Sequence, residues 1–228
     1  MATIQSNLQA VNARIAAACN AAGRDPASVR LVAVSKTWPA GAVREAAAAG
    51  QTDFGENYLQ EALDKIGALA APTLTWHFIG PLQSNKTRPV AEHFDWVHSV
   101  DREKIAERLN AQRPSSAPAL NVCIQVNISG EASKSGVAPA ALAPLARELA
   151  RMPRLRLRGL MSVPEPTPDS ALSRRRFASL RGLLEALNRD GLALDTLSMG
   201  MTADLEAAIA EGATMVRVGT AIFGARPS

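Results

Sequence analysis

The feature of this sequence that most constrains its fold is a regular alternation of short apolar runs with stretches of helical periodicity. Eight runs of strand length are separated by helical patterns, and they lie at 29–35, 53–55, 74–79, 96–100, 119–128, 155–163, 194–199 and 215–219. Strict alternation of this kind predicts a parallel sheet covered by helices. Eight units predict a (β/α)8 TIM barrel, and 228 residues lie near the lower end of the usual length for that fold.

An open, doubly wound sheet is the alternative architecture. The first predicted strand is not followed by a G-x-G-x-x-G sequence, which weakens the dinucleotide-binding version of that fold. Leu8, Val11 and Ile15 lie near one face of a predicted amphipathic helix that precedes the first strand. Since no linker rich in Pro, Gly or Ser is long enough to mark a boundary, we expect one domain over residues 1–228.

Composition argues against several classes of function. The net charge of +4 is spread out and aromatic residues make up only 4% of the chain, whereas nucleic-acid-binding proteins usually show a dense basic stripe with aromatics between the charges. Cys19 and Cys123 are isolated, which argues against a disulfide framework or a zinc site and fits a reducing cytoplasm. Residues 1–23 contain no continuous apolar core, so we predict neither a signal peptide nor a membrane span.

Lys36 is oddly placed, because it follows directly after the apolar run that ends in Val34 and Ser35. Burying an ammonium without a partner is costly, so one interpretation is that the side chain reaches out into water. The other is that Lys36 forms a Schiff base with an aldehyde cofactor, since burial lowers the pKa of an amine and frees its lone pair for attack on a carbonyl. Residues 31–38 taken alone favour the first interpretation, a lysine whose side chain reaches into water.

The loops after the seventh and eighth strands indicate a phosphate site, because barrels usually bind phosphate there. Gly200 allows a close approach of the backbone and Thr202 supplies a hydroxyl, while Gly219 and Thr220 offer a further backbone N–H and hydroxyl. Each loop taken alone is explained by ordinary turn and capping chemistry. Both loops together, with a lysine after the first strand, favour a phosphorylated ligand.

Arg217 is the third candidate feature of a binding site, after Lys36 and the two phosphate loops. Val216 and Val218 share one face of the eighth strand, so Arg217 points to the other face. If the valines face the helices, Arg217 points into the mouth of the barrel, where its partner is either an acidic side chain or a ring nitrogen of a cofactor. A guanidinium only donates hydrogen bonds, so it would hold a pyridine nitrogen unprotonated and make the ring a weaker electron sink.

Eight stretches of the chain together resemble one known family. They are 32–37, 54–58, 76–86, 126–128, 133–136, 159–161, 197–201 and 216–224. In these stretches, which extend over nearly the whole chain, the sequence closely resembles the pyridoxal phosphate homeostasis protein family (the YggS/PROSC type). The resemblance implies a single barrel like the N-terminal domain of bacterial alanine racemases.

The resemblance also implies a cofactor, pyridoxal 5′-phosphate (PLP), held as a Schiff base on Lys36, with Arg217 at its pyridine nitrogen. The implied phosphate contacts are Ser198, Gly200, Thr202, Gly219 and Thr220. One departure is Thr202, where many members are expected to carry Ser, and the hydroxyl is kept. Three further residues are candidates around the ring: Asn57 and His77 as contacts or as support, and Met199 as packing.

Two functions follow from these assignments. The resemblance implies a cytoplasmic PLP carrier or buffer that affects amino-acid metabolism indirectly, with PLP-requiring apo-enzymes as candidate recipients and Lys134 as a hypothetical transfer site. The alternative is a weak PLP-dependent racemase or decarboxylase. Tyr58 is the only tyrosine, and no second acid–base group is evident, so we expect little turnover. A complete barrel can stand alone, so we expect a monomer.

Overall fold

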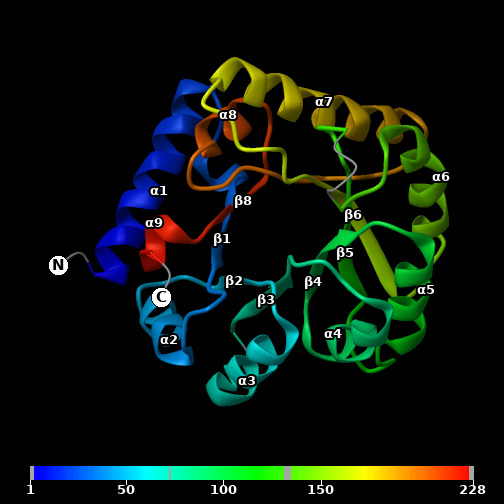
Figure 1. Cartoon of the computed structure of the whole chain (residues 1–228), viewed down its shortest axis with the longest axis horizontal. Coiled ribbons are helices and arrows are strands. Elements are labelled where there is room, and N and C mark those ends of the chain that lie inside the picture. The colour runs from blue at the N-terminus through cyan, green and yellow to red at the C-terminus, as the bar shows by residue number, and fades with distance from the viewer. Residues whose placement is uncertain (1–2, 72, 131–134, 226–228) are drawn as a thin grey trace.

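The computed structural model describes residues 3–71, 73–130 and 135–225, and its strands close into a parallel barrel with helices outside (Figure 1). The strands are β1 Arg30–Val34, β2 Asp53–Glu56, β3 Thr75–Phe78, β4 Trp96–Val100, β5 Leu120–Gln125, β6 Leu155–Met161, β7 Thr196–Ser198 and β8 Met215–Val218. β1 pairs with β8 in parallel, with Val32 opposite Arg217, and this pairing closes the ring. The predicted (β/α)8 barrel is therefore confirmed, and the open sheet is excluded.

Helices follow the strands in the predicted order. They are α1 Ile4–Ala21, α2 Ala40–Ala48, α3 Leu59–Leu69, α4 Thr87–His93, α5 Glu103–Gln112, α6 Pro139–Ala150, α7 Ser170–Arg189, α8 Leu205–Ala210 and α9 Thr220–Phe223. Two of them begin at side-chain caps: Thr3 caps α1, and Asp169 accepts hydrogen bonds from two backbone N–H groups of α7. Among the described helices, none combines the length and the apolar character that crossing a membrane requires.

The alternation of side chains along each strand separates two apolar clusters. Val216 and Val218 belong to the large cluster between the strands and the surrounding helices, as predicted, while Met215 on the same strand faces inward. The inner cluster consists of Val32, Trp96, Cys123, Met161 and Met215. Inward-facing positions on the strands are therefore the ones that set the chemistry of the barrel interior.

The N-terminal helix α1 lies beside α8 and α9, where the first and last parts of the chain meet (Figure 1). Asn7 donates from Nδ2 to the carbonyl oxygen of Ile222 at 2.8 Å. Arg14 pairs with Glu206 and also donates to the carbonyl oxygen of Thr202 at 3.0 Å. The helix predicted before the first strand thus supports the loops that follow β7 and β8.

β7 is shorter than the predicted strand at 194–199. Leu194 is buried, but its backbone N–H and carbonyl are both bonded by the side chain of Asn188, at 2.7 and 2.9 Å. A backbone residue whose polar groups are occupied by a side chain has none left for a neighbouring strand. The strand therefore begins only at Thr196.

We expect Gly159→Ala to destabilise the barrel, because the new Cβ would lie only 1.8 Å from the carbonyl oxygen of Thr196 on the adjoining strand. The cost should be about 3 kcal/mol or more in the free energy of unfolding, measured by urea denaturation. Gly182→Ala lies in the interior of α7, where no atom of the described residues comes within 4 Å of the new Cβ. It is the control and should stabilise the protein by about 1 kcal/mol. Equal effects of the two changes would contradict the packing described for β6 and β7.

Candidate functional site

A cavity of about 310 Å³ opens at the carboxyl ends of the strands. This volume is at the lower end of the range of about 300–1,000 Å³ that is usual for small-molecule sites. The lining residues are Val34, Lys36, Asn57, Ile79, Val163, Met201, Thr202, Ala203, Arg217, Gly219 and Thr220. The structure thus brings together six of the predicted site residues, namely Lys36, Asn57, Thr202, Arg217, Gly219 and Thr220.

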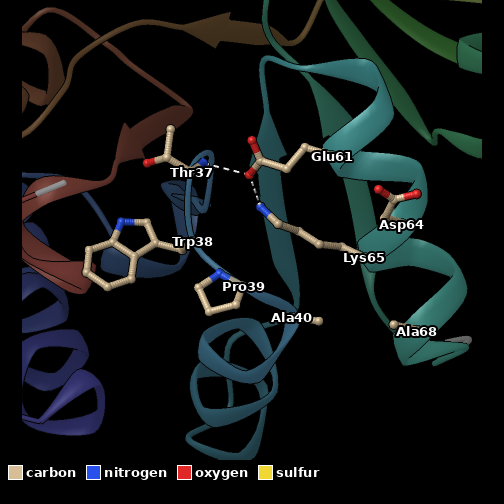
Figure 2. Close-up of a pocket in the computed structure, with 8 residues that line it drawn as sticks. All are labelled: Thr37, Trp38, Pro39, Ala40, Glu61, Asp64, Lys65 and Ala68. Atoms are coloured by element: carbon tan, nitrogen blue, oxygen red, sulfur yellow. Dashed lines mark hydrogen bonds and ion pairs between the residues drawn. The ribbon is translucent and has the colours of Figure 1, made fainter. Parts of the chain in front are cut away.

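Lys36 lies just beyond β1, and the backbone is fixed on both sides of it. Before it, the buried Ser35 donates from Oγ to a carboxylate oxygen of Glu56 at 2.6 Å. After it, Thr37 donates its N–H to Glu61 at 2.6 Å, as Figure 2 shows. Thr37 has a φ of +68°, a left-handed conformation that costs a non-glycine residue about 1 kcal/mol or more. Contacts from β2 and α3 therefore hold this segment in place.

Lys65 of α3 joins these contacts into one cluster. Its buried ammonium donates to the carbonyl oxygen of Ser35 and to Glu56, each at 2.7 Å. It also donates to Glu61, and Figure 2 shows this bond. Three acceptors match the three N–H bonds of an ammonium. Desolvation raises the pKa of the Glu56 carboxyl, and the positive charge of Lys65 opposes that shift. Lys65 thus ties both neighbours of Lys36 to the same helix.

The groove in Figure 2 is a separate and larger hollow, of about 540 Å³, between α2 and α3. It is lined by Trp38, Pro39 and Ala40 on one side and by Asp64, Lys65 and Ala68 on the other. Lys65 uses its donors within the protein, and Lys36 is not part of this lining. The cavity at the strand ends, although smaller, is where the candidate reactive groups meet.

Arg217 reaches this cavity from β8 but is otherwise enclosed, with 4% of its surface exposed. One terminal nitrogen donates to Ser198 Oγ at 2.6 Å and the other to the carbonyl oxygen of Ser162 at 2.8 Å. Desolvation lowers the pKa of the guanidinium to about 10, so the group remains charged at neutral pH. Its inward direction agrees with the alternation predicted along the eighth strand.

Gly219 brings two loops of the site into close contact. A Cβ added at this position would lie 3.1 Å from the carbonyl oxygen of Val34, at the end of β1. Gly200 has a φ of +92°, and a Cβ there would meet Ala208 at 2.5 Å. Glycine is required at Gly200 for both reasons, and it lets the loop after β7 pass close to α8.

Four predicted site residues do not line the cavity: His77, Ser198, Met199 and Gly200. Met199 is fully buried in the layer between strands and helices, because alternation turns it outward when Ser198 faces inward. Its predicted packing beside a ring is corrected to packing against helices. His77 is likewise fully buried, with both ring nitrogens bonded inside the barrel, so of the two roles predicted for it, contact or support, its position favours support.

A line of hydrogen bonds runs through the barrel interior from the site. His98 Nδ1 lies 2.7 Å from Ser198 Oγ, and His98 Nε2 lies 2.9 Å from His77 Nδ1. His77 Nε2 then lies 3.0 Å from an Asp53 carboxylate oxygen. Desolvation lowers the pKa of both imidazoles, that of His98 well below its ordinary value, so both are neutral at neutral pH.

Two residues of this region were missed by the analysis of the sequence. His98 and Ser162 are not among the site residues that the sequence predicts. A signal for His98 exists, because it is two residues after Trp96 and so shares the inward face of β4. For Ser162 nothing in the sequence distinguishes it from other loop serines.

Two buried polar atoms near the cavity, Asn57 Oδ1 and Ser162 Oγ, have no hydrogen-bond partner among the residues that the structure describes. Buried polar groups are normally hydrogen-bonded, so such atoms indicate the place of a polar ligand. Together with an amine, a guanidinium and two threonine hydroxyls, they form a set of donors and acceptors that fits a phosphorylated aldehyde with a heterocyclic nitrogen.

Comparisons with known proteins show which family the chain belongs to. A family model described as the alanine racemase N-terminal domain matches residues 6–227. The chain is 66% identical, over 99% of its length, to the pyridoxal phosphate homeostasis protein of Pseudomonas aeruginosa, 97% of which is covered. The corresponding protein of Escherichia coli K12 is 55% identical, with 99% and 98% covered. The chain belongs to the pyridoxal phosphate homeostasis protein family.

Solved structures extend the comparison. PipY of Synechococcus elongatus, solved with PLP bound, is 40% identical with a TM-score of 0.86, and the match covers 97% of this chain and 100% of that one. The alanine racemase of Corynebacterium glutamicum has a TM-score of 0.73 at 19% identity, covering 96% of this chain and 62% of the racemase. The second likeness shows the fold alone. The membership of this family that the sequence motifs predict is therefore confirmed.

The two buried histidines predict a loss of stability on acidification. Below about pH 6.5 the unfolded chain takes up protons that folded His77 and His98 do not, because their folded pKa values are depressed. The free energy of unfolding should therefore fall as the pH decreases, by up to about 1.4 kcal/mol per pH unit for each imidazole. Urea unfolding at a series of pH values measures the slope.

The control for this slope is the third histidine. His93 is exposed at the end of α4, so His93→Gln should leave the slope unchanged, whereas His98→Asn should reduce it. A slope that stays the same in His98→Asn would show that the buried pair does not cause the acid sensitivity.

Lys65→Met should destabilise the protein by about 3–5 kcal/mol, because it leaves the buried Glu56 without its positive partner. The double variant Lys65→Met/Glu56→Gln should recover a large part of that loss, since the uncompensated charge is gone. Urea unfolding of the two single variants and the double variant forms the required cycle. Strictly additive losses would mean that the two groups do not interact energetically.

Proposed function

We propose that this chain binds PLP in the cavity at the strand ends and acts in PLP homeostasis as a carrier or buffer, affecting amino-acid metabolism indirectly. The observation that carries the proposal is the meeting of Lys36, Arg217 and the loop of Gly219 and Thr220 around one cavity. Relatives at 55–66% identity named as pyridoxal phosphate homeostasis proteins support it, and PipY with PLP bound supports the cofactor. Two free, buried cysteines support placing this activity in the cytoplasm.

Five of the residues that line the cavity have a specific role in this proposal. PLP supplies an aldehyde, with which the Lys36 amine forms a Schiff base and releases one water molecule. Arg217 donates to the pyridine nitrogen, and it can do so because a guanidinium has more N–H bonds than its two protein contacts use. Thr202, Gly219 and Thr220 contribute hydroxyl and backbone donors for the phosphate.

The same groups support a carrier more than an efficient enzyme. A donor at the pyridine nitrogen keeps it unprotonated, so the ring withdraws electrons less strongly than it does beside an acidic partner. Tyr58 is exposed at the start of α3, at 53% of its surface, and it does not line the cavity. We infer little or no turnover, a monomer, and delivery to PLP-requiring apo-enzymes. Lys134, the hypothetical transfer site, lies outside the described residues.

The decisive experiment combines absorbance with chemical trapping. Purified protein mixed with PLP should develop a visible band that borohydride bleaches, and peptide mapping should place the reduced adduct on Lys36. Lys36→Ala should lose the band. The matched control is Lys86→Ala, an exposed lysine in the loop after β3, which should keep it. A band that persists in Lys36→Ala, or an adduct on another lysine, rejects the Schiff base assignment.

The racemase or decarboxylase alternative needs a separate measurement. Exchange of the α-proton of L-alanine in heavy water, followed by NMR, should be negligible for the loaded protein. Rapid exchange that is abolished in Lys36→Ala would establish an amino-acid-transforming enzyme in place of a carrier.

A further inference from the structure

The hydrogen bonds inside the barrel join its two ends. Asp53 is the first residue of β2, at the amino end of the strands, while Ser198 is the last residue of β7, at the carboxyl end beside the cavity. His77 and His98 span the distance between them, and both are fully buried. The His77 ring also stacks on Trp96, with the ring planes 13° apart, so its orientation is fixed. Arg217 completes the chain at the cavity.

The chemistry of the groups gives this series of hydrogen bonds one direction, from Arg217 to Asp53. Arg217 can only donate, so Ser198 Oγ accepts from it, and the one hydroxyl proton of Ser198 is bonded within this series of side chains only if it is donated to His98 Nδ1. A neutral His98 then carries its proton on Nε2 and donates to His77 Nδ1. By the same logic His77 carries its proton on Nε2 and donates to the carboxylate of Asp53, which only accepts. In this arrangement each hydrogen bond between Arg217 and Asp53 has one donor and one acceptor, and both His77 and His98 carry their proton on Nε2.

The carboxylate is the group that makes the direction unique. An amide at position 53 could present either its oxygen or its NH2 group to His77, and the second choice reverses both tautomers. In the reversed series of hydrogen bonds, Ser198 accepts from both His98 and Arg217. The hydroxyl proton of Ser198 then has no acceptor among these five side chains. The ionised state of Asp53 is supported by Arg30 at 3.3 Å. A charge at the amino end of the barrel thereby sets the hydrogen bonding of Arg217 at the other end.

We propose that Asp53, His77 and His98 are positioning residues for Arg217, which fix the direction in which its remaining N–H bonds meet the cofactor. The inference rests on the proposed function, since the group to be met is the ring nitrogen of PLP. Within the described part of the chain, no carboxylate lies within ion-pair distance of Arg217. The orientation of Arg217 is therefore set by Ser198 and the Ser162 carbonyl. The hydrogen bonds from His98 back to Asp53 determine whether the Ser198 hydroxyl donates to His98 or accepts from it.

The first test reads the tautomers directly. Histidine labelled with 15N in the rings gives signals from the three histidines, and His93, exposed on α4, serves as the reference. At neutral pH, His77 and His98 should both show protonated Nε2 and unprotonated Nδ1. A protonated Nδ1 on His98 in the wild-type protein would overturn the proposal, whether or not PLP binds.

The second test makes the readout specific for the ring nitrogen. Affinity is measured for PLP and for its carbocyclic analogue, in which a C–H group replaces the pyridine nitrogen. Asp53→Asn should weaken PLP binding about tenfold, as expected for the loss of an ordered hydrogen bond to a charged group, and should leave binding of the analogue unchanged. The visible band of the PLP complex should shift as well. Equal weakening of both ligands would indicate a merely structural role and would reject the proposal.

A matched carboxylate provides the control. Asp95 lies at the amino end of β4 and accepts from the backbone N–H of Trp76 at 2.8 Å. It is not part of the series of hydrogen bonds that leads to Arg217. Asp95→Asn should alter neither the tautomers nor the ratio of the two affinities. If Asp95→Asn changes this ratio as much as Asp53→Asn does, the proposal is wrong.

A third measurement keeps the proposal testable if Asp53→Asn does not fold. In the wild-type protein, PLP should move the ring signals of His98, whereas the carbocyclic analogue should move them little. Similar shifts with both ligands would reject the inference while leaving PLP binding intact. If the wild-type protein binds neither ligand, the proposed function fails, and this inference fails with it.

Discussion

Closure of eight short parallel strands is the constraint on which the rest of this structure depends. A barrel of this size has an interior just wide enough to be filled by side chains, so each inward-facing position must find a partner. Part of the interior is filled by apolar groups around Trp96 and Met215. The remainder is polar, and it is tolerated because hydrogen bonds link Asp53, His77, His98 and Ser198 to one another. Ser198 and the Ser162 carbonyl accept hydrogen bonds from Arg217 and so offset part of the cost of burying its guanidinium.

Both key side chains of the cavity are held by groups that do not line it. Behind Lys36 lies the cluster centred on Lys65, which fastens the preceding and following residues to α3. Behind Arg217 lies the histidine pair. In each case a buried charge is bonded by several partners at once, so moving it would leave polar groups unsatisfied. Rigid support of this kind suits a protein whose task is to hold a reactive aldehyde in one place.

The sequence predicts the architecture and the rim of the site well, because both depend on local patterns. Apolar runs locate the strands, and Lys36, Gly219 and Thr220 are found because active loops follow strand ends. Period-two alternation also predicts the direction of Arg217. It does not give the depth of a side chain in the barrel, which is why His77 is assigned to the cavity when it lies below it. The pairing of Asp53 with His77 joins residues 24 positions apart and depends on strand register.

The pairing of β1 with β8 has a consequence for how the protein is made. The cavity joins Val34 and Lys36 to Arg217 and Gly219, which are far apart in the sequence and are synthesised at different times. A nascent chain therefore has no complete cavity until Arg217 and Gly219 have left the ribosome and can pair with β1. Contacts between distant segments also form late because of the entropy of loop closure. In the proposed function, uptake of PLP then requires that β1 and β8 have paired, and nascent chains that lack β8 do not withdraw PLP from the free pool.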